Sequence, residues 1–396
     1  MIDIAERLDP VLEIAREHAR DVDSAGRFPE EAIAALRSSG LLGLTLPAEV
    51  GGLGQGPREL VRVASALAGA CGSTAMIYLM HVSAAMPVAA APPTGMPGLL
   101  NDLASGRFLA SLAFSEAGSR SHFWAPVSRQ TTTPGGIRVS AKKSWVTSAG
   151  HADVYVISTG TPDAAGVDLF AIPAGSPGLT IDRPWSGMGF RGNSSSPMTV
   201  EVDTAEEFRL GTAGGGFDLM MGHVLPWFNL GNSAVSIGLS RAAVDAAVRH
   251  TMGARLEHLD ESLSSLPTIR AQLAKMSIDL ANASAYLDMA ASKVATPEDD
   301  TPLFVLGSEA SSNDAALRIT DVAMRVCGGA AFSEHLQIDR YFRDARAGHV
   351  MAPTSDVLYE FYGRAITGRP LFDAPKPVAE TQVAETRVAE TAGAAA

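Results

Sequence analysis

Apolar side chains recur every three or four positions through the first part of the chain, as an amphipathic helix requires. Residues 8–15 carry one such series, and residues 59–80 form a second helical run. Pro29 comes just before two glutamates, a combination typical of the first turn of a helix. Three glycines within residues 51–54 predict a loop. The pattern therefore predicts an N-terminal helical domain over residues 1–110.

The pattern then changes to short apolar runs rich in β-branched residues, each bounded by Gly, Pro or Asp. Such runs are typical of β-strands, and their close spacing favours a compact antiparallel sheet or barrel. We expect a middle β domain over residues 111–210. The runs occupy residues 108–114, 137–140, 154–158, 168–172 and 198–202.

Helical spacing returns after a glycine-rich stretch at residues 211–216 and continues to residue 372. The long segments 235–250, 268–294 and 304–327 are joined by short breaks, which predicts an antiparallel helix bundle over residues 211–372. Residues 373–396 repeat a Val-Ala-Glu-Thr unit and lack a core-forming pattern, so we expect a disordered tail there. The fold class expected is mainly α with a central β domain.

One stretch could be mistaken for a membrane segment. Residues 64–101 contain no Asp, Glu, Lys or Arg, and length alone would allow a span. The stretch is dominated by small residues and is broken at Pro92 and Pro93. We therefore predict a buried helix or helix pair, and no membrane association.

Composition excludes several classes of function. The chain of 396 residues carries 31 Lys and Arg against 43 Asp and Glu, a net charge of −12, which argues against nucleic-acid binding. Two cysteines, Cys71 and Cys327, suit a reducing compartment, and we expect a cytoplasmic protein. No metal-ligand spacing, phosphate loop or Rossmann fingerprint is present, so no metal site is expected.

Several short motifs could serve a flat cofactor. Residues 114–121, Phe-Ser-Glu-Ala-Gly-Ser-Arg-Ser, follow a predicted strand and would let the backbone approach closely. In residues 145–150, Trp-Val-Thr-Ser-Ala-Gly, an indole and a hydroxyl could stack on a ring and bond its nitrogen. Residues 188–196 precede the last predicted strand, and two glycines follow Cys327. Each motif alone is also compatible with a turn, a half-buried Trp or a helix cap.

Together with the Leu-Gly-Leu-Thr-Leu-Pro-Ala-Glu-Val-Gly-Gly-Leu-Gly loop at residues 42–54, these motifs resemble the acyl-CoA dehydrogenase superfamily in order and spacing. The resemblance spans residues 28–372. It implies an N-terminal helical domain, a middle β domain and a C-terminal four-helix bundle, assembled as a homodimer or homotetramer. It also implies a flavoprotein oxidoreductase that binds FAD and oxidises an acyl thioester on CoA or a carrier protein.

The resemblance also implies a set of cofactor-site residues. Trp145 and Thr147 would pack on the isoalloxazine ring, and a segment with Arg325 would reach the FAD of a neighbouring subunit. Arg255 matches a family arginine at the adenosine end, although the Phe and Gly that follow it in the family are absent, which leaves FMN as an alternative cofactor. The full set is Phe114, Ser115, Ser121, Trp145, Thr147, Arg255, Arg325, Gly328, Gly329 and Thr354.

The chain departs from the family at the catalytic base. Removal of an α-proton needs a proton acceptor, and the family's usual Glu position is occupied by Ala352. A minority of the family carries its Glu on an earlier helix, but residues 226–230, Pro-Trp-Phe-Asn-Leu, offer no carboxylate there. The catalytic residues are therefore unknown, and His81, His349 and Asp356 are weak candidates.

Two alternative functions stay open at this point. The C-terminal residues 362–371 are similar to a branch of the family that carries out monooxygenation or N-hydroxylation with reduced flavin and oxygen. That branch needs no α-proton base. The other alternative is a non-catalytic homologue that binds flavin or thioester. The expected partners are accordingly an acyl thioester or another small molecule, with an electron-transfer flavoprotein, a flavin reductase or oxygen as the redox partner.

Overall fold

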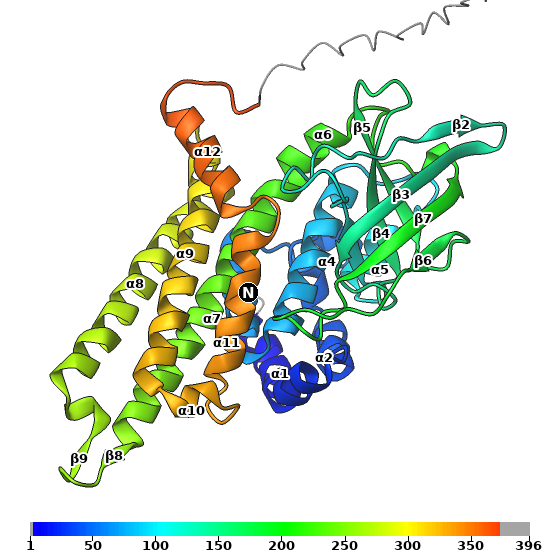
Figure 1. The fold of residues 1–396 in the computed structure, drawn as a ribbon. Coiled ribbons are helices and arrows are strands. Elements are labelled where there is room, and N and C mark those ends of the chain that lie inside the picture. Colours follow the sequence, from blue (N-terminus) through cyan, green and yellow to red (C-terminus); the bar gives the residue numbers. More distant parts are fainter. Residues whose placement is uncertain (1–2, 373–396) are drawn as a thin grey trace, which may run out of the picture.

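The computed structural model describes residues 3–372, so the predicted tail at 373–396 lies outside the described residues. Helices from the first third of the chain lie between a β region on one side and a bundle of long helices on the other (Figure 1). The predicted fold class, mainly α with a central β domain, is confirmed by this arrangement.

The N-terminal helices pack around α4, which is buried over most of its length. They are α1 (Ile4–Ala25), α2 (Glu30–Ser39), α3 (Pro57–Ala70), α4 (Gly72–Ala90) and α5 (Leu99–Ala104), with short 3₁₀ turns η1 (Leu41–Gly43) and η2 (Ala48–Val50). Asp3 caps α1 by accepting a hydrogen bond from the backbone N–H of Ala5 at 2.8 Å. α2 begins directly after Pro29, as predicted.

By length and apolar composition, α4 could cross a membrane, and it is the one helix within residues 3–372 that could. Burial explains its composition instead, because 78% of its apolar 18-residue stretch is buried inside the protein. α4 packs against α3, α7 and strand β1. The prediction of a buried helix is confirmed.

Two sheets form the β region and share one apolar core. The first has the strand order β1 (Ala110–Ala113), β4 (Val154–Gly160), β5 (Val167–Pro173). The second has the order β2 (Thr131–Thr133), β3 (Gly136–Val146), β7 (Ser196–Thr204), β6 (Leu179–Ile181). Side chains from β1, β3, β4, β5 and β7 meet between the sheets, among them Val139, Phe170 and Val200.

The prediction of an antiparallel sheet or barrel is wrong at one strand pairing. β1 runs parallel to β4, with Ala110 opposite Val154. A parallel pair needs a long crossover, and here residues 114–153 supply one that includes β2 and β3 of the other sheet. Alternation of apolar and polar residues reveals a strand but not the direction of its partner.

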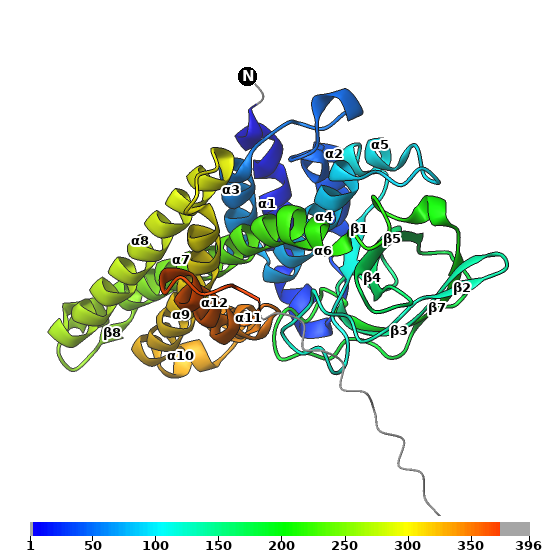
Figure 2. The ribbon, with the colours of Figure 1, turned by 90° about the horizontal axis from the view of Figure 1, so that it is seen from above.

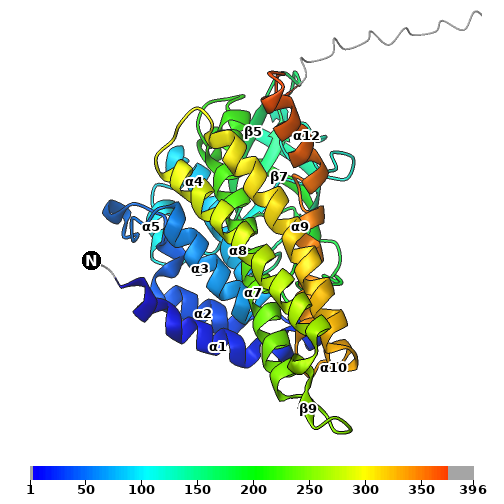
Figure 3. The same ribbon diagram turned by 90° about the vertical axis from the view of Figure 1, so that its left-hand side faces the viewer.

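The long helices form the bundle seen at the left of Figure 1, with α7 next to the N-terminal helices (Figures 2 and 3). α7 packs against α3, α4, α8, α9 and α11. The elements that follow β7 in the chain, most of them in this bundle, are η3 (Glu206–Phe208), α6 (Gly216–Leu219), a π turn η4 (Met220–Val224), α7 (Leu225–Gly253), β8 (Arg255–Leu256), β9 (Glu261–Ser262), η5 (Leu263–Ser265), α8 (Pro267–Ala295), α9 (Thr301–Cys327), α10 (Gly329–Phe332), α11 (Ile338–Val350) and α12 (Ser355–Ile366).

Candidate functional site

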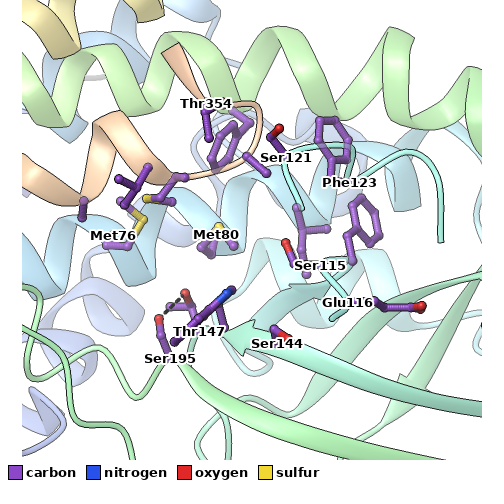
Figure 4. A pocket seen from close by; sticks show the side chains of 18 of the residues that line it. Met76, Met80, Ser115, Glu116, Ser121, Phe123, Ser144, Thr147, Ser195 and Thr354 are labelled. Carbon is purple, nitrogen blue, oxygen red and sulfur yellow. Dashed lines mark hydrogen bonds between the residues drawn. The ribbon is translucent and has the colours of Figure 1, made fainter. Parts of the chain in front are cut away.

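A pocket of about 820 Å³ opens where the β region meets α4, α7 and the connection between α11 and α12 (Figure 4). Its size lies within the usual range for small-molecule sites. Met76 and Met80 of α4 and Phe228 of α7 give it an apolar wall, and the 112–123 segment and the α11–α12 connection supply further lining residues.

Most of the cofactor residues expected from the sequence line this pocket. They come from three segments that lie far apart in the chain, and the fold brings them together. These residues are Phe114, Ser115, Ser121, Trp145, Thr147 and Thr354, and Ala352 lies among them.

Trp145 and Thr147 lie at the end of β3, where the strand is irregular. The β3–β7 register shifts between Lys143 and Val146, and Trp145 has a φ of +57°. A positive φ is unusual for a bulky residue, and such backbone conformations are found at functional sites. The indole is 58% exposed and meets Trp185 edge-on, with ring centroids 5.8 Å apart. The irregular strand end therefore presents an aromatic side chain to the pocket.

Hydroxyl groups lie beside this indole. Thr147 Oγ1 and Ser195 Oγ share a hydrogen bond of 2.9 Å, and Ser111 Oγ donates to the carbonyl of Thr147 at 2.6 Å. Both Thr147 and Ser195 line the pocket and are otherwise buried. Their hydroxyls can exchange this mutual bond for one to a polar ligand atom.

A buried ion pair that the sequence analysis missed holds the 114–128 segment in place. Lys143 Nζ donates to Glu116 Oε1 at 2.5 Å and to the carbonyl of Ser158 at 2.5 Å. Glu116 also accepts from the backbone N–H groups of Val127 (2.8 Å) and Ser128 (2.7 Å) and from Ser128 Oγ (2.6 Å). Glu116 lies inside the 114–121 motif and Lys143 just before the 145–150 motif, but nothing in the sequence pairs them.

The electrostatics of this pair are set by its burial. The Lys143 side chain is 0% exposed and that of Glu116 is 4% exposed. Burial lowers the pKa of Lys143 to about 8. Burial also disfavours the charged Glu116 carboxylate, but the Lys143 charge and the hydrogen bonds outweigh it and hold the pKa of Glu116 below its usual value. Glu116 is thus a bound, ionised group with little capacity to accept another proton.

The pocket wall offers no free general base. Among the described lining residues, Glu116 and Arg120 are the ionisable ones, and Glu116 is occupied by the contacts above. Ala352, at the family's usual Glu position, lies in the wall, and so does Phe228, which belongs to the alternative region 226–230. The departure noted in the sequence therefore persists in the assembled site.

His81, a weak catalytic candidate, is a structural residue. It is fully buried in α4, where Nδ1 accepts from the backbone N–H of Ala110 (3.0 Å) and Nε2 lies 3.1 Å from the carbonyl of Leu42. Burial lowers the pKa of His81 to about 4. Both ring nitrogens contact main-chain atoms, and His81 does not line the pocket. The suggestion that His81 is a catalytic residue is therefore wrong.

The other two weak candidates also lie outside the pocket lining. On α11, Ala347, Val350 and Met351 face the pocket, whereas His349 faces α9 with Nδ1 3.4 Å from Asp314 Oδ1. Asp356 is exposed in the first turn of α12. The positions of both residues on their helices keep their side chains out of the pocket lining. The suggestion that either one is a catalytic residue is therefore wrong.

Four predicted cofactor residues lie at the far end of the bundle. Arg255 is in β8 and bonds the carbonyl of Asp260 at 3.0 Å, while Arg325, Gly328 and Gly329 lie at the junction of α9 and α10 (Figure 1). None of the four lines this pocket. The resemblance assigns residues 325–329 to a neighbouring subunit's cofactor, so their role stays a prediction.

Comparison with known proteins agrees with this architecture. Three family models match the chain: the acyl-CoA dehydrogenase N-terminal domain over residues 11–93, the middle domain over 111–202 and the C-terminal domain over 214–367. The chain is 27% identical to cyclohex-1-ene-1-carbonyl-CoA dehydrogenase of Geobacter metallireducens, over 91% of this chain and 96% of that one. It is 26% identical to the mitochondrial short-chain specific acyl-CoA dehydrogenase of Bos taurus, over 86% of this chain and 83% of that one.

Solved structures show the same fold. Butyryl-CoA dehydrogenase from Megasphaera elsdenii superposes with a TM-score of 0.84 at 22% identity, covering 93% of this chain and 100% of that one. FkbI, described as acting in the biosynthesis of a methoxymalonyl extender unit, superposes with a TM-score of 0.83 at 22% identity, covering 92% and 100%.

Proposed function

Since this chain belongs to the acyl-CoA dehydrogenase family, we propose that the pocket at the end of β3 is the place where it oxidises an acyl thioester with FAD. The protein is a flavin-dependent oxidoreductase of the acyl-CoA dehydrogenase type. The reaction we propose is α,β-dehydrogenation of a thioester carried on CoA or on a carrier protein. The single observation that carries the placement is the convergence of Trp145, Thr147 and the 114–121 segment on one apolar pocket.

The residues present fit a flat, partly polar ring system. The Trp145 indole is exposed to the pocket although it is large and apolar, so a bound ring would remove it from water. Within the described residues 3–372, the hydroxyls of Thr147 and Ser195 have each other as their only hydrogen-bond partner. We assign Trp145 and Thr147 to the isoalloxazine, with Phe114, Ser115, Ser121 and Thr354 around the flavin and thioester. FAD bound there supplies the acceptor for a hydride from the β-carbon.

The chain's own residues shape the rest of the site. Met76, Met80 and Phe228 provide an apolar surface for the acyl group and exclude water from it. Glu116 and Lys143 fix the 114–128 segment and so position Ser115 and Ser121. Positioning of this kind contributes to rate by holding reacting groups in a productive orientation.

Partners and assembly follow from the same assignment. An electron-transfer flavoprotein is the redox partner that we propose for the reduced cofactor, and the names of the relatives favour a dehydrogenase over the oxygen-using alternative. We further propose a cytoplasmic homodimer or homotetramer, in which the neighbour's Arg325 and Gly328–Gly329 segment completes each cofactor site.

Anaerobic mixing tests the proposed function. The purified yellow protein is mixed with a panel of straight-chain and branched saturated acyl-CoA thioesters, and flavin absorbance is followed. Bleaching without oxygen is the expected result. A flavin that no thioester bleaches would overturn the proposal, and oxygen uptake after NADH-linked reduction would then favour the oxygen-using alternative.

A further inference from the structure

A second feature of the bundle bears on the missing base, and it involves α7, which also lines the pocket. Five polar residues are buried on the facing sides of α7 and α9 and at the start of α12: Asn229, Asn232, Glu309, Ser312 and Ser355. We call this group the buried polar seam. Each of the five is at most 1% exposed, which is rare for a glutamate without an ionic partner.

One hydrogen bond joins two residues of the buried polar seam, and several of its other polar atoms have no hydrogen-bond partner within residues 3–372. Asn232 Nδ2 donates to Glu309 Oε1 at 2.6 Å. Within residues 3–372, the structure offers no hydrogen-bond partner to Glu309 Oε2, to either amide atom of Asn229, or to the hydroxyls of Ser312 and Ser355. A buried polar atom left unpaired costs about 1–3 kcal/mol. Several unpaired atoms in one region therefore indicate internal water, which bridges such groups in proteins.

The seam begins one helical turn from the pocket, because Asn232, which bonds Glu309, lies four residues after the pocket-lining Phe228 on α7. Phe228 lines the pocket and Asn229 follows it; Thr354 lines the pocket and Ser355 follows it. Further along the same helices, Ser236 Oγ donates to Asn313 Oδ1 (2.7 Å), whose amide donates to the carbonyl of Gly348 (2.8 Å). These bonds fix α7, α9 and α11 together beside Ala347 of the wall.

We propose that Glu309 is the proton acceptor of the dehydrogenation, reached from the substrate through water held by Ser355 and Asn229. This inference rests on the proposed function. The C–H bond at the α-carbon breaks, its proton passes along the water to the Glu309 carboxylate, and its electron pair becomes the new α,β bond. The β-hydrogen leaves as a hydride, for which the flavin is the oxidant. Glu309 acts through water, so it is a positioning and relay residue that does not touch the substrate.

The pKa of Glu309 suits this task. Burial raises it to about 8, and the hydrogen bond from Asn232 offsets only part of that effect. A base with a pKa near the operating pH accepts a proton effectively while a useful fraction stays ionised.

No neighbouring charge sets this pKa, because burial and the Asn232 bond account for it. The α7 residues that are buried around Asn232, residues 228–240, include no ionisable side chain. Near Glu309, the neighbouring helices bring three titratable side chains to α9: Tyr362 of α12, packed against the cluster that contains Leu306 and Ala310, Tyr286 of α8 at Gly307 and Lys293 of α8 at Phe304. Further along α9 they bring Asp279 of α8 at Arg318, His349 of α11 and Tyr359 of α12 at Asp314, and Arg346 of α11 at Thr320.

The test compares the wild-type holoenzyme with Glu309→Gln, which keeps an oxygen for the Asn232 bond. In anaerobic mixing with the acyl-CoA panel, the wild-type rate of flavin reduction should rise with pH through about 8. Glu309→Gln should be about 10²- to 10⁴-fold slower, the range typical of a positioned base, and its rate should not rise with pH. Glu309→Asp should recover part of the rate and the pH dependence. Glu17→Gln, an exposed glutamate on α1, serves as the matched control and should behave as wild type.

A second readout does not depend on turnover. Infrared titration of the full-length protein without flavin should show a protonated carboxyl that ionises near pH 8 and is missing from Glu309→Gln. Equal rates and pH profiles for wild type and Glu309→Gln would overturn the relay, while bleaching of the wild type would still support the proposed function. A wild type that no thioester bleaches would overturn both. An infrared spectrum unchanged by Glu309→Gln would also overturn the relay.

Discussion

Replacement of Lys143 by methionine tests how much of the site depends on one buried ion pair. The change removes an ammonium that is 0% exposed and leaves the Glu116 carboxylate, 4% exposed, without its counter-charge. Removal of one partner of a buried pair typically costs 3–5 kcal/mol. Glu116 keeps three donors from Val127 and Ser128, whereas the carbonyl of Ser158 loses its lysine. We therefore expect a loss of about 3–4 kcal/mol.

The assay is a double-mutant comparison of thermal unfolding at fixed protein concentration. A loss of about 3 kcal/mol corresponds to a fall in Tm of about 6–12 °C for a unit of 150–250 residues. Lys143→Met/Glu116→Gln should recover part of this fall because it removes the stranded charge. FAD occupancy should fall in Lys143→Met, since Ser115 and Ser121 lie on the segment that Glu116 holds. A Tm within about 2 °C of wild type, or a double variant no more stable than the single one, would refute this reasoning.

Three further predictions concern the pocket and the buried polar seam. Burial raises the pKa of Glu309 to about 8 in the folded protein, so the unfolded chain ionises first as pH rises. Wild type should therefore lose stability relative to Glu309→Gln between about pH 4.5 and 8, and the full loss is on the order of 5 kcal/mol. A Tm difference between the two proteins that is the same at pH 5 and pH 8 would contradict this prediction. Trp145→Ala should weaken FAD binding by about tenfold, as expected from lost stacking of about 1 kcal/mol together with lost burial; fluorescence titration of the flavin-free protein measures this, and unchanged affinity would remove Trp145 from the flavin site. Ala352→Glu in the Glu309→Gln background should restore thioester-dependent flavin reduction, because it returns a carboxylate to the pocket wall; failure to restore it in a folded, flavin-loaded variant would show that the α-carbon does not lie beside residue 352.

Local patterns were sufficient to predict most elements of this fold. The strand at 154–158 was expected from its β-branched residues and is observed as β4, Val154–Gly160. The helical run at 304–327 is observed as α9, Thr301–Cys327. The parallel β1–β4 pairing and the separation into two sheets were not predicted. Both depend on which strands meet after long connections, and residue periodicity carries no information on that.

The same limit applies to the site. Trp145 and Thr147 could be singled out because each carries its chemistry within one short motif. Lys143 and Glu116 are 27 residues apart, and Asn232 and Glu309 are 77 residues apart. A lysine in a strand and a glutamate in a helix are most often solvent-exposed, so only the packed structure reveals that these are buried. His81 shows the opposite error: a chemically versatile side chain that serves main-chain hydrogen bonds.

The way in which α11 is anchored explains how position 352 can lack a carboxylate without loss of the pocket. Asp344 accepts from the backbone N–H of Phe190 at 2.6 Å, and Arg343 bonds both Asp23 (2.5 Å) and the carbonyl of Met188 (3.1 Å). Gly189 lies so close to α11 that a Cβ there would come within 2.5 Å of the Arg343 carbonyl.

These contacts join the helix to α1 of the N-terminal domain and to the loop at residues 188–190, which also lines the pocket. The wall at residues 347–354 is therefore positioned by bonds one to two turns earlier on α11, and none of those bonds involves residue 352. A change from carboxylate to methyl at this position alters the chemistry of the pocket while its shape is kept. The proton must then be taken by another group of the same frame, and Glu309, which α9 holds against Asn232 of α7, is the group that we propose.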